Sequence, residues 1–266
     1  MNRQPVVAGQ FYPGNGPALR ASVAGYLQGE PSGQRTLLAM APHAGYVFSG
    51  AVAGNTIAQA SLAKRIILIG PNHTGRGKKI AVWDEGRWLL PDINVPVDFE
   101  LAGAVLEIPG FSADYEAHLY EHSLEVILPF LGAVMDDFSI VPVAVAEPDL
   151  NSLLEAGMNL ALILKKMNID VSLVVSTDMS HYISHDQAEK IDRLAIDQVL
   201  AMDPEGLYRV VADNKISMCG VLPMVLGLAC VRELGAKRAR LTKYSTSGQV
   251  NNDFSKVVGY AGVLIS

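Results

Sequence analysis

The sequence predicts one three-layer α/β/α domain, with a central mixed and mostly parallel sheet, for residues 1–266. Apolar runs of strand length alternate with segments of helical periodicity, which is the pattern of a sheet covered by helices on both faces. Most of these runs are continuous in aliphatic or β-branched residues, as burial on two faces requires. No composition break, low-complexity linker or internal repeat divides the chain. These observations favour a single α/β domain over two smaller ones.

Six runs have the composition of central strands, and two shorter ones are interpreted as an edge hairpin. The central strands are expected at residues 36–41, 65–70, 139–144, 171–176, 239–244 and 257–265, and the hairpin at 79–83 and 87–90.

Seven segments between the strands have helical periodicity. Asp149 and Asp203 stand where N-caps belong, and Asp203 is followed by Pro204 at the first helical position. The helices are expected at residues 50–63, 98–106, 123–135, 150–167, 185–200, 204–212 and 220–234.

Charge and hydropathy argue against several classes of partner. The chain carries 21 Lys and Arg against 27 Asp and Glu, a net charge of −6, and 50% of its residues are apolar. No basic cluster with interleaved aromatics is present to neutralise phosphates, so we expect neither a nucleic-acid nor a membrane partner. The longest apolar run, residues 221–231, is about half of the roughly 20 residues that span a bilayer. We therefore expect a cytoplasmic protein that binds a small molecule or a peptide.

The two cysteines, Cys219 and Cys230, are too few for a disulfide framework. Cys219 stands just before the apolar helix expected at 220–234, whose positive end would lower the thiol pKa and favour the thiolate that binds metals. The alternative for Cys219 is a small buried apolar residue. Cys230, on an apolar helix face, is predicted to be a core residue.

Polar side chains follow three of the predicted strands at the point where each strand ends. His43 follows the first strand, His73 the second, and Asp178 and His181 the fourth. Ligands of open α/β sheets bind outside the carboxyl ends of parallel strands, so we expect these side chains to share one site. Taken singly, each is equally compatible with a loop or capping role. Glycine-rich loops beside His43 and His73 would let the backbone approach a ligand closely.

A competing pattern is His118-x-x-Glu121-His122, which is typical of one class of zinc protease. The string is short, Pro129 lies within the helix that follows it, and no third zinc ligand stands at a suggestive distance. We keep a zinc protease as an alternative. His122 can also point its imidazole toward the cleft that contains His43.

Six segments, taken in order, carry a resemblance to a known family. They are VAGQFYP at 7–13, APHAGYVFSG at 41–50, GPNH at 70–73, EHSLEVILPF at 121–130, STDMSHY at 176–182 and MCG at 218–220. Together they resemble the Memo family, whose bacterial and archaeal relatives are called AmmeMemoRadiSam system protein B. Because the match covers nearly the whole chain, it is far more specific than any one motif. The fold of the family is similar to that of the class III extradiol dioxygenases.

The resemblance implies that His43, His73 and Cys219 are metal ligands. The related dioxygenases hold iron(II) with two His and one carboxylate, which leaves positions open for oxygen and substrate. Here a softer thiolate would replace the carboxylate, which suits copper(I) or a redox-active iron. Iron(II) or copper is therefore the expected cofactor, with zinc as a further candidate.

The resemblance also implies that His181, Asp178 and His122 lie around the same pocket. We assign them catalytic roles, with His181 oriented by Asp178 and shuttling protons to bound oxygen or substrate. Tyr46 and Asn72, in the two loops that carry metal ligands, are expected to contact the substrate.

Two functions follow from this reading. The first is a mononuclear metal-dependent redox enzyme, related to extradiol dioxygenases, that acts on a small substrate. The second is a non-catalytic module that binds a peptide or small ligand in the same pocket, since animal relatives are implicated in signalling. Gene neighbours of the relatives include a radical-SAM protein, which implies a functional link to that pathway. No heptad pattern or exposed amphipathic helix points to an oligomer interface.

Overall fold

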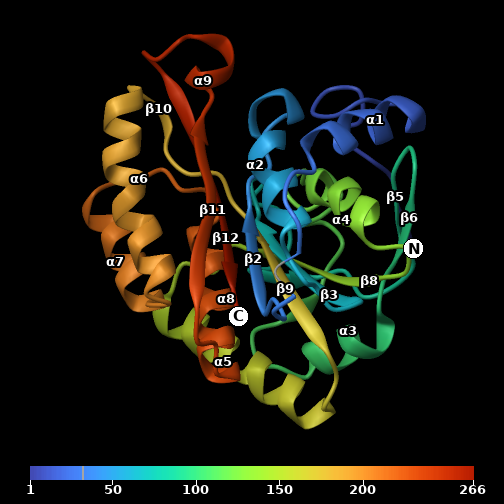
Figure 1. Cartoon of the computed structure of the whole chain (residues 1–266). Coiled ribbons are helices and arrows are strands. Elements are labelled where there is room, and N and C mark those ends of the chain that lie inside the picture. The colour runs from blue at the N-terminus through green and yellow to red at the C-terminus, as the bar shows by residue number, and fades with distance from the viewer. Residues whose placement is uncertain (32) are drawn as a thin grey trace.

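The computed structural model describes residues 1–31 and 33–266, in which a broad mixed sheet lies between two layers of helices (Figure 1). This confirms the predicted three-layer fold. The sheet strands, in spatial order, are β10 (His181–Ile183), β12 (Val257–Ile265), β2 (Leu38–Ala41), β9 (Val171–Ser176), β3 (Arg65–Pro71), β8 (Ser139–Val145), β4 (Ile80–Val82) and β7 (Ser112–Ala113), and β11 (Ala239–Thr246) pairs with β12 off this path.

The centre of the sheet is parallel, whereas its flanks are mixed. Strand β9 lies between β2 and β3 and is parallel to both, and β3 is also parallel to β8. Strand β12 pairs antiparallel with β2, and β4 pairs antiparallel with β8. Because β2, β9 and β3 are adjacent and parallel, their carboxyl ends meet at one edge of the sheet.

Helices cover both faces of the sheet. One core cluster packs the first face against α3 (Phe99–Leu106), α5 (Leu150–Met167), α6 (His185–Leu200), α7 (Pro204–Asp213) and α8 (Val221–Leu234). The other cluster packs the second face against α1 (Gly16–Tyr26), α2 (Tyr46–Ala58), the 3-10 turn η1 (Glu125–Ile127) and α4 (Leu128–Val134). A short helix, α9 (Gly248–Asn251), follows β11. In the described part of the chain, no helix combines the length and apolarity needed to cross a bilayer.

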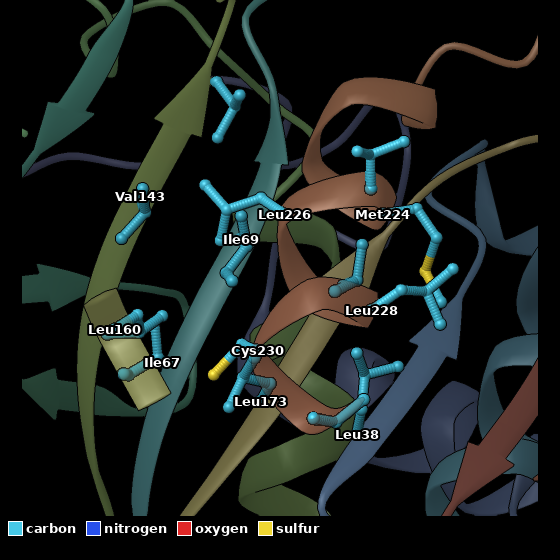
Figure 2. Close-up of a cluster of buried hydrophobic side chains, with 14 of the residues drawn as sticks. Leu38, Ile67, Ile69, Val143, Leu160, Leu173, Met224, Leu226, Leu228 and Cys230 are labelled. Carbon is cyan, nitrogen blue, oxygen red and sulfur yellow. The ribbon is translucent and has the colours of Figure 1, made fainter. Parts of the chain in front are cut away.

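Alternate residues of each central strand enter opposite cores. In β2, Leu38 and Met40 belong to the first cluster, whereas Ala39 and Ala41 belong to the second. This period-two pattern explains why the strands are continuously apolar in sequence. Figure 2 shows α8 lying across the strands on the first face, with Cys230 among the core side chains. Cys230 is fully buried, which confirms its predicted place in the core.

The predicted hairpin at 79–83 and 87–90 is wrong. Strand β4 joins the large sheet, whereas β5 (Arg87–Leu89) forms a separate small sheet with β1 (Asn2–Arg3) and β6 (Asn94–Pro96). The two segments do not pair with each other because β4 pairs with β8 and β7, whereas β5 pairs with the N-terminal strand β1. Long-range pairing of this kind leaves no local sequence signal.

Other differences between expectation and structure concern helix boundaries. Helix α1 was not predicted, although Asn15 caps it and a proline stands in its first turn. Helix α2 begins four residues earlier than expected, at Tyr46. The segment 123–135 divides into η1 and α4 because Pro129 lacks the N–H that a helix interior requires and so occupies the first turn of α4. Asp149 and Asp203 cap α5 and α7, as predicted.

Close packing of α5 on α8 depends on Gly157. A Cβ atom at this position would collide with the backbone oxygen of Leu226 and lie 2.7 Å from the Cβ of Ala229. Alanine normally stabilises a helix by about 1 kcal/mol over glycine, but overpacking a core costs about 1–3 kcal/mol. We therefore expect Gly157→Ala to lower the free energy of unfolding, as measured by urea denaturation. The matched control is Gly103→Ala in α3, where no described residue outside the helix's own turn lies within 4 Å of the added Cβ and stability should rise. Equal stabilisation by both changes would contradict this.

Candidate functional site

Three histidines meet at the carboxyl edge of the parallel strands. His43 follows β2, His73 follows β3, and His122 lies in the loop that precedes η1. The ring centroids of His43 and His73 are 5.2 Å apart, and the ring of His122 lies 5.5 Å from the first and 4.9 Å from the second. One ligand atom from each imidazole lies within 4.8 Å of the other two. The chain thus brings three imidazoles from three separate segments to one point.

The ring of His43 is held in one tautomer by two buried serines. The hydroxyl of Ser176 donates to the backbone oxygen of Ser123 at 2.7 Å, so its oxygen must accept the hydrogen on Nδ1 of His43, also at 2.7 Å. Burial, together with the neighbouring imidazoles of His122 and His73, holds the pKa of His43 well below 6.5. The ring is therefore neutral, with an unprotonated Nε2 facing the cluster.

The buried carboxylate of Glu121 lies beside the other two histidines, His73 and His122. Glu121 accepts hydrogen bonds from the backbone N–H of His73 at 2.6 Å, from its Nδ1 at 2.9 Å, and from the backbone N–H of Ser123 at 2.9 Å. Nδ1 of His122 lies 3.6 Å from the same carboxylate. Burial alone would raise the pKa of Glu121, but the hydrogen bond and charge of His73 lower it to about 2. Glu121 is thus ionised at neutral pH and directs Nε2 of His73 toward the cluster.

Exposure increases across the cluster. His43 is 2% exposed, whereas the side chains of His122 and His73 are 24% and 34% exposed. Burial lowers the pKa of His122, while the ion pair with Glu121 outweighs burial and raises that of His73. The site is therefore closed behind His43 and open to solvent beside His73.

Cys219 lies against His43 at the start of α8. Its Sγ is 3.3 Å from Nε2 of His43 and accepts the backbone N–H of Asp178 at 3.2 Å. The next residue is Gly220, and a Cβ there would collide with the side chain of Thr177, so only glycine allows this approach. The end of the helix was expected to lower the pKa of this thiol, and that expectation is wrong. Burial and the Asp178 carboxylate raise the pKa of Cys219 instead.

Asp178 and His181 lie beside the cluster, but Asp178 does not orient His181 as the sequence suggested. Asp178 accepts the backbone N–H of His43 at 2.8 Å, and burial raises its pKa to about 6. The ring of His181 donates from Nδ1 to the backbone oxygen of Ser217 at 2.9 Å, so Ser217 orients it. None of the described residues forms a hydrogen bond with its Nε2. The nearby charge of His181 acts on Asp178 by lowering its pKa against the effect of burial.

The two residues expected to contact substrate have other partners in the structure. Tyr46 is buried, and its hydroxyl donates to the backbone oxygen of Val126 at 2.8 Å. The side chain of Asn72 bonds within its own loop, donating to the backbone oxygen of Arg76 and accepting from the N–H of Gly75. Substrate contact by either residue stays a prediction.

His118 is not part of the cluster of three histidines. It is fully buried, and its Nε2 donates to the backbone oxygen of Ala81 at 3.1 Å. Its ring lies 6.0 Å from that of Trp83 and 5.9 Å from that of Trp88. Within the described residues, the paired imidazoles of a zinc protease are therefore absent from the 118–122 segment.

Burial of His118 makes stability depend on pH. It lowers the pKa of His118 from 6.5 to about 4, so below pH 6.5 the unfolded chain binds a proton that the folded chain does not. The contribution of neutral, buried His118 to the free energy of unfolding is complete above pH 6.5, decreases as the pH falls, and is lost near pH 4. The total decrease is about 3 kcal/mol. Glutamine cannot titrate in this range. We therefore expect urea denaturation to show that the free energy of unfolding of His118→Gln decreases less between pH 6.5 and pH 4 than that of the unmodified protein. An identical acid profile would contradict this.

Sequence reasoning missed the residues that orient the ligands. The sequence indicates Glu121 only within a protease pattern and within the family segment at 121–130, and it indicates no role for Ser176 or Ser217. Their positions offered a signal, because Glu121 directly precedes His122 and Ser176 ends the strand that leads to Asp178. Hydrogen bonds between distant segments have no sequence signature of their own, so these roles required the structure.

Comparison with known proteins agrees with the motifs. The model of the Memo-like protein family matches residues 3–264. A MEMO1 family protein of Methanopyrus kandleri is 39% identical over 279 residues, which cover 99% of this chain and 99% of that protein. A MEMO1 family protein of Aquifex aeolicus is 37% identical, and the match covers 98% of each chain.

A solved structure shares the fold at much lower sequence similarity. It is that of an uncharacterized protein from Escherichia coli K12, with a TM-score of 0.58 and 13% identity, covering 86% of this chain and 99% of that one. The family model and the curated relatives each extend over nearly the whole chain. The chain therefore belongs to the Memo-like protein family.

Proposed function

We propose that this protein binds one iron(II) or copper ion with the imidazoles of His43, His73 and His122, and uses it in a redox reaction on a small molecule. Cys219 would supply a further donor beside His43. The observation that carries the proposal is the convergence of three imidazole ligand atoms within 4.8 Å of one another.

The chemistry of the donor set fits such an ion. Metal-binding imidazoles in proteins have one nitrogen engaged by a hydrogen bond and the other free. His43 and His73 meet this condition through Ser176 and Glu121. The Sγ of Cys219 lies 3.3 Å from Nε2 of His43, close to the roughly 3.5 Å expected between two ligands of one tetrahedral ion. Imidazole with thiolate favours iron, copper or zinc over harder cations.

The carboxylates near the cluster have a different role from the ligand of the related dioxygenases. Glu121 is occupied by three N–H donors, and Asp178 accepts the backbone N–H of His43. In this proposal the softer Cys219, whose Sγ lies 3.3 Å from Nε2 of His43, takes the place of the carboxylate ligand. This composition supports redox chemistry at a nitrogen- and sulfur-rich site.

The residues around the cluster define what each side of the site does. The bound metal would supply a centre that accepts or donates electrons. Buried His43 closes one side to water, and Glu121 keeps His73 in a fixed tautomer. His181, which is oriented by Ser217 and lies near Asp178, holds or moves a proton at the rim. The open side beside His73 admits the substrate.

Metal content of the purified protein tests the proposal. The protein is prepared without oxygen and without a metal-affinity column, and its metals are quantified by elemental analysis. We expect close to one iron or copper per chain, and oxygen uptake when a reductant is added. Absence of any transition metal, even after anaerobic reconstitution, would contradict the proposal and favour a module that binds a peptide or small ligand without metal.

A further inference from the structure

An ion pair between Arg3 and Glu125 is buried next to the histidine cluster. The side chains are 1% and 0% exposed, and Nη1 of Arg3 lies 2.7 Å from Oε2 of Glu125. Removing two charges from water is costly, and a well-packed apolar pair is often as stable as a buried ion pair. The stability of the fold therefore does not by itself explain why these two charges are buried here.

Arg3 holds the main chain that leads to Glu121 and His122. Its Nε donates to the backbone oxygen of His118 at 2.9 Å, and its Nη2 donates to the backbone oxygen of Glu121. The guanidinium lies over the ring of Trp88, 4.1 Å from the ring centroid. With one face packed on Trp88 and with Nε, Nη1 and Nη2 each donating a hydrogen bond, Arg3 fixes both ends of the 118–121 segment.

Glu125 holds the N-terminal segment against the other side of the site. Its carboxylate accepts the backbone N–H groups of Val6 and Val7 and the hydroxyl of Tyr12, the last at 2.6 Å. In the same segment, the ring of Phe11 lies 4.8 Å from the ring of His122. The backbone oxygen of Phe11 accepts the N–H of Tyr46, three residues after His43.

We propose that the buried Arg3–Glu125 pair is a positioning device for the histidine cluster. It sets the main chain at Glu121, which fixes the carboxylate that orients His73, and it seats Phe11 against the ring of His122. This rests on the proposed metal site for its purpose, but the positioning itself concerns the imidazoles of the metal-free protein.

Two readouts separate positioning from a merely structural role. One is the nitrogen chemical shifts of the His73 and His122 imidazoles in the metal-free protein, which report tautomer and hydrogen bonding. The other is affinity for Co(II), added alone as a probe and followed by its visible absorption. Both readouts are measured for Arg3→Met and for the partial replacement Arg3→Lys, at a temperature at which each variant is folded.

The matched control is Arg65→Met. Arg65 also forms an ion pair, with Asp98 at 2.5 Å, but it begins β3 at the opposite edge of the sheet from His73. The seven residues of β3, which rise about 20 Å along the strand, separate the two edges. Loss of this pair should lower the melting temperature without changing the cluster.

The expected result is that Arg3→Met changes the His73 and His122 shifts and weakens Co(II) binding about tenfold or more, as loss of a ligand-orienting group does. Arg3→Lys should recover part of both, and Arg65→Met should change neither. A lower melting temperature in Arg3→Met with unchanged shifts and affinity would overturn the proposal.

If Arg3→Met does not fold, Glu125→Gln provides the same comparison. If the unmodified protein binds no metal, the proposed function fails, and the shifts alone decide the positioning role.

Discussion

Replacement of His43 by alanine is expected to abolish stoichiometric metal binding. His43 is the most buried imidazole of the cluster, is held neutral by burial, and is the histidine that Cys219 contacts. Loss of a residue that only orients a ligand costs 10–100-fold in affinity, so removal of the ligand itself should cost more than about 100-fold. The measurement is metal per chain after anaerobic reconstitution, together with the dissociation constant for Co(II).

The control for this change is His185→Ala. His185 also has its Nδ1 bound to a hydroxyl, that of Thr246 at 2.9 Å, but it lies on α6 outside the cluster. His43→Ala removes the N–H that the buried Ser176 oxygen accepts, although the Ser176 hydroxyl still donates to the backbone oxygen of Ser123. An unsatisfied buried acceptor costs about 1–3 kcal/mol, so the fold must first be verified by circular dichroism. A folded His43→Ala protein that retains a full complement of metal would show that His43 is not a ligand.

Glu121→Gln is expected to weaken metal binding about 10–100-fold. The carboxylate accepts three N–H groups, two from His73 and one from Ser123, whereas an amide has one oxygen and presents an NH2 group to the remaining donors. His73 would then lose its fixed tautomer. Because the pKa of Glu121 is about 2, its carboxylate is ionised from about pH 4 upward, and the difference in affinity should persist across neutral pH. Isothermal titration with Co(II) at two pH values measures it.

Glu189→Gln is the matched control. Glu189 also pairs with a histidine, His185, at 3.4 Å, but its side chain is 52% exposed and distant in sequence from the cluster. An exposed pair of this kind contributes little to stability, so its loss should leave affinity unchanged. Equal affinities for Glu121→Gln and the unmodified protein would mean that Glu121 serves the fold rather than the ligands.

The central architecture was predictable because it is encoded locally. Two-sided burial makes β3, β8 and β9 continuously apolar, and side-chain caps such as Asp149 mark helix starts. The failures involve partners that are distant in sequence. Strand β5 pairs with the N-terminal strand rather than with its neighbour β4, and no local pattern distinguishes these choices.

The site was predictable in outline because parallel strands deliver their following residues to one edge. His43 and His73 could be placed at one edge because each directly follows a predicted strand of a mostly parallel sheet. His122 lies in a loop outside the sheet, so its approach to the other imidazoles depends on contacts such as that with Phe11. Likewise, the pKa of Cys219 is governed by burial and Asp178, which the helix-end argument did not include.

X-ray absorption at the metal edge tests the account most directly. The unmodified protein, reconstituted anaerobically with iron(II), is compared with Cys219→Ser. We expect imidazole scattering with nitrogens at about 2.0–2.2 Å in both proteins, and a sulfur at about 2.3 Å that is lost only in the variant. A metal surrounded by oxygen alone, without imidazole scattering and with identical spectra for the two proteins, would contradict a site built from His43, His73, His122 and Cys219.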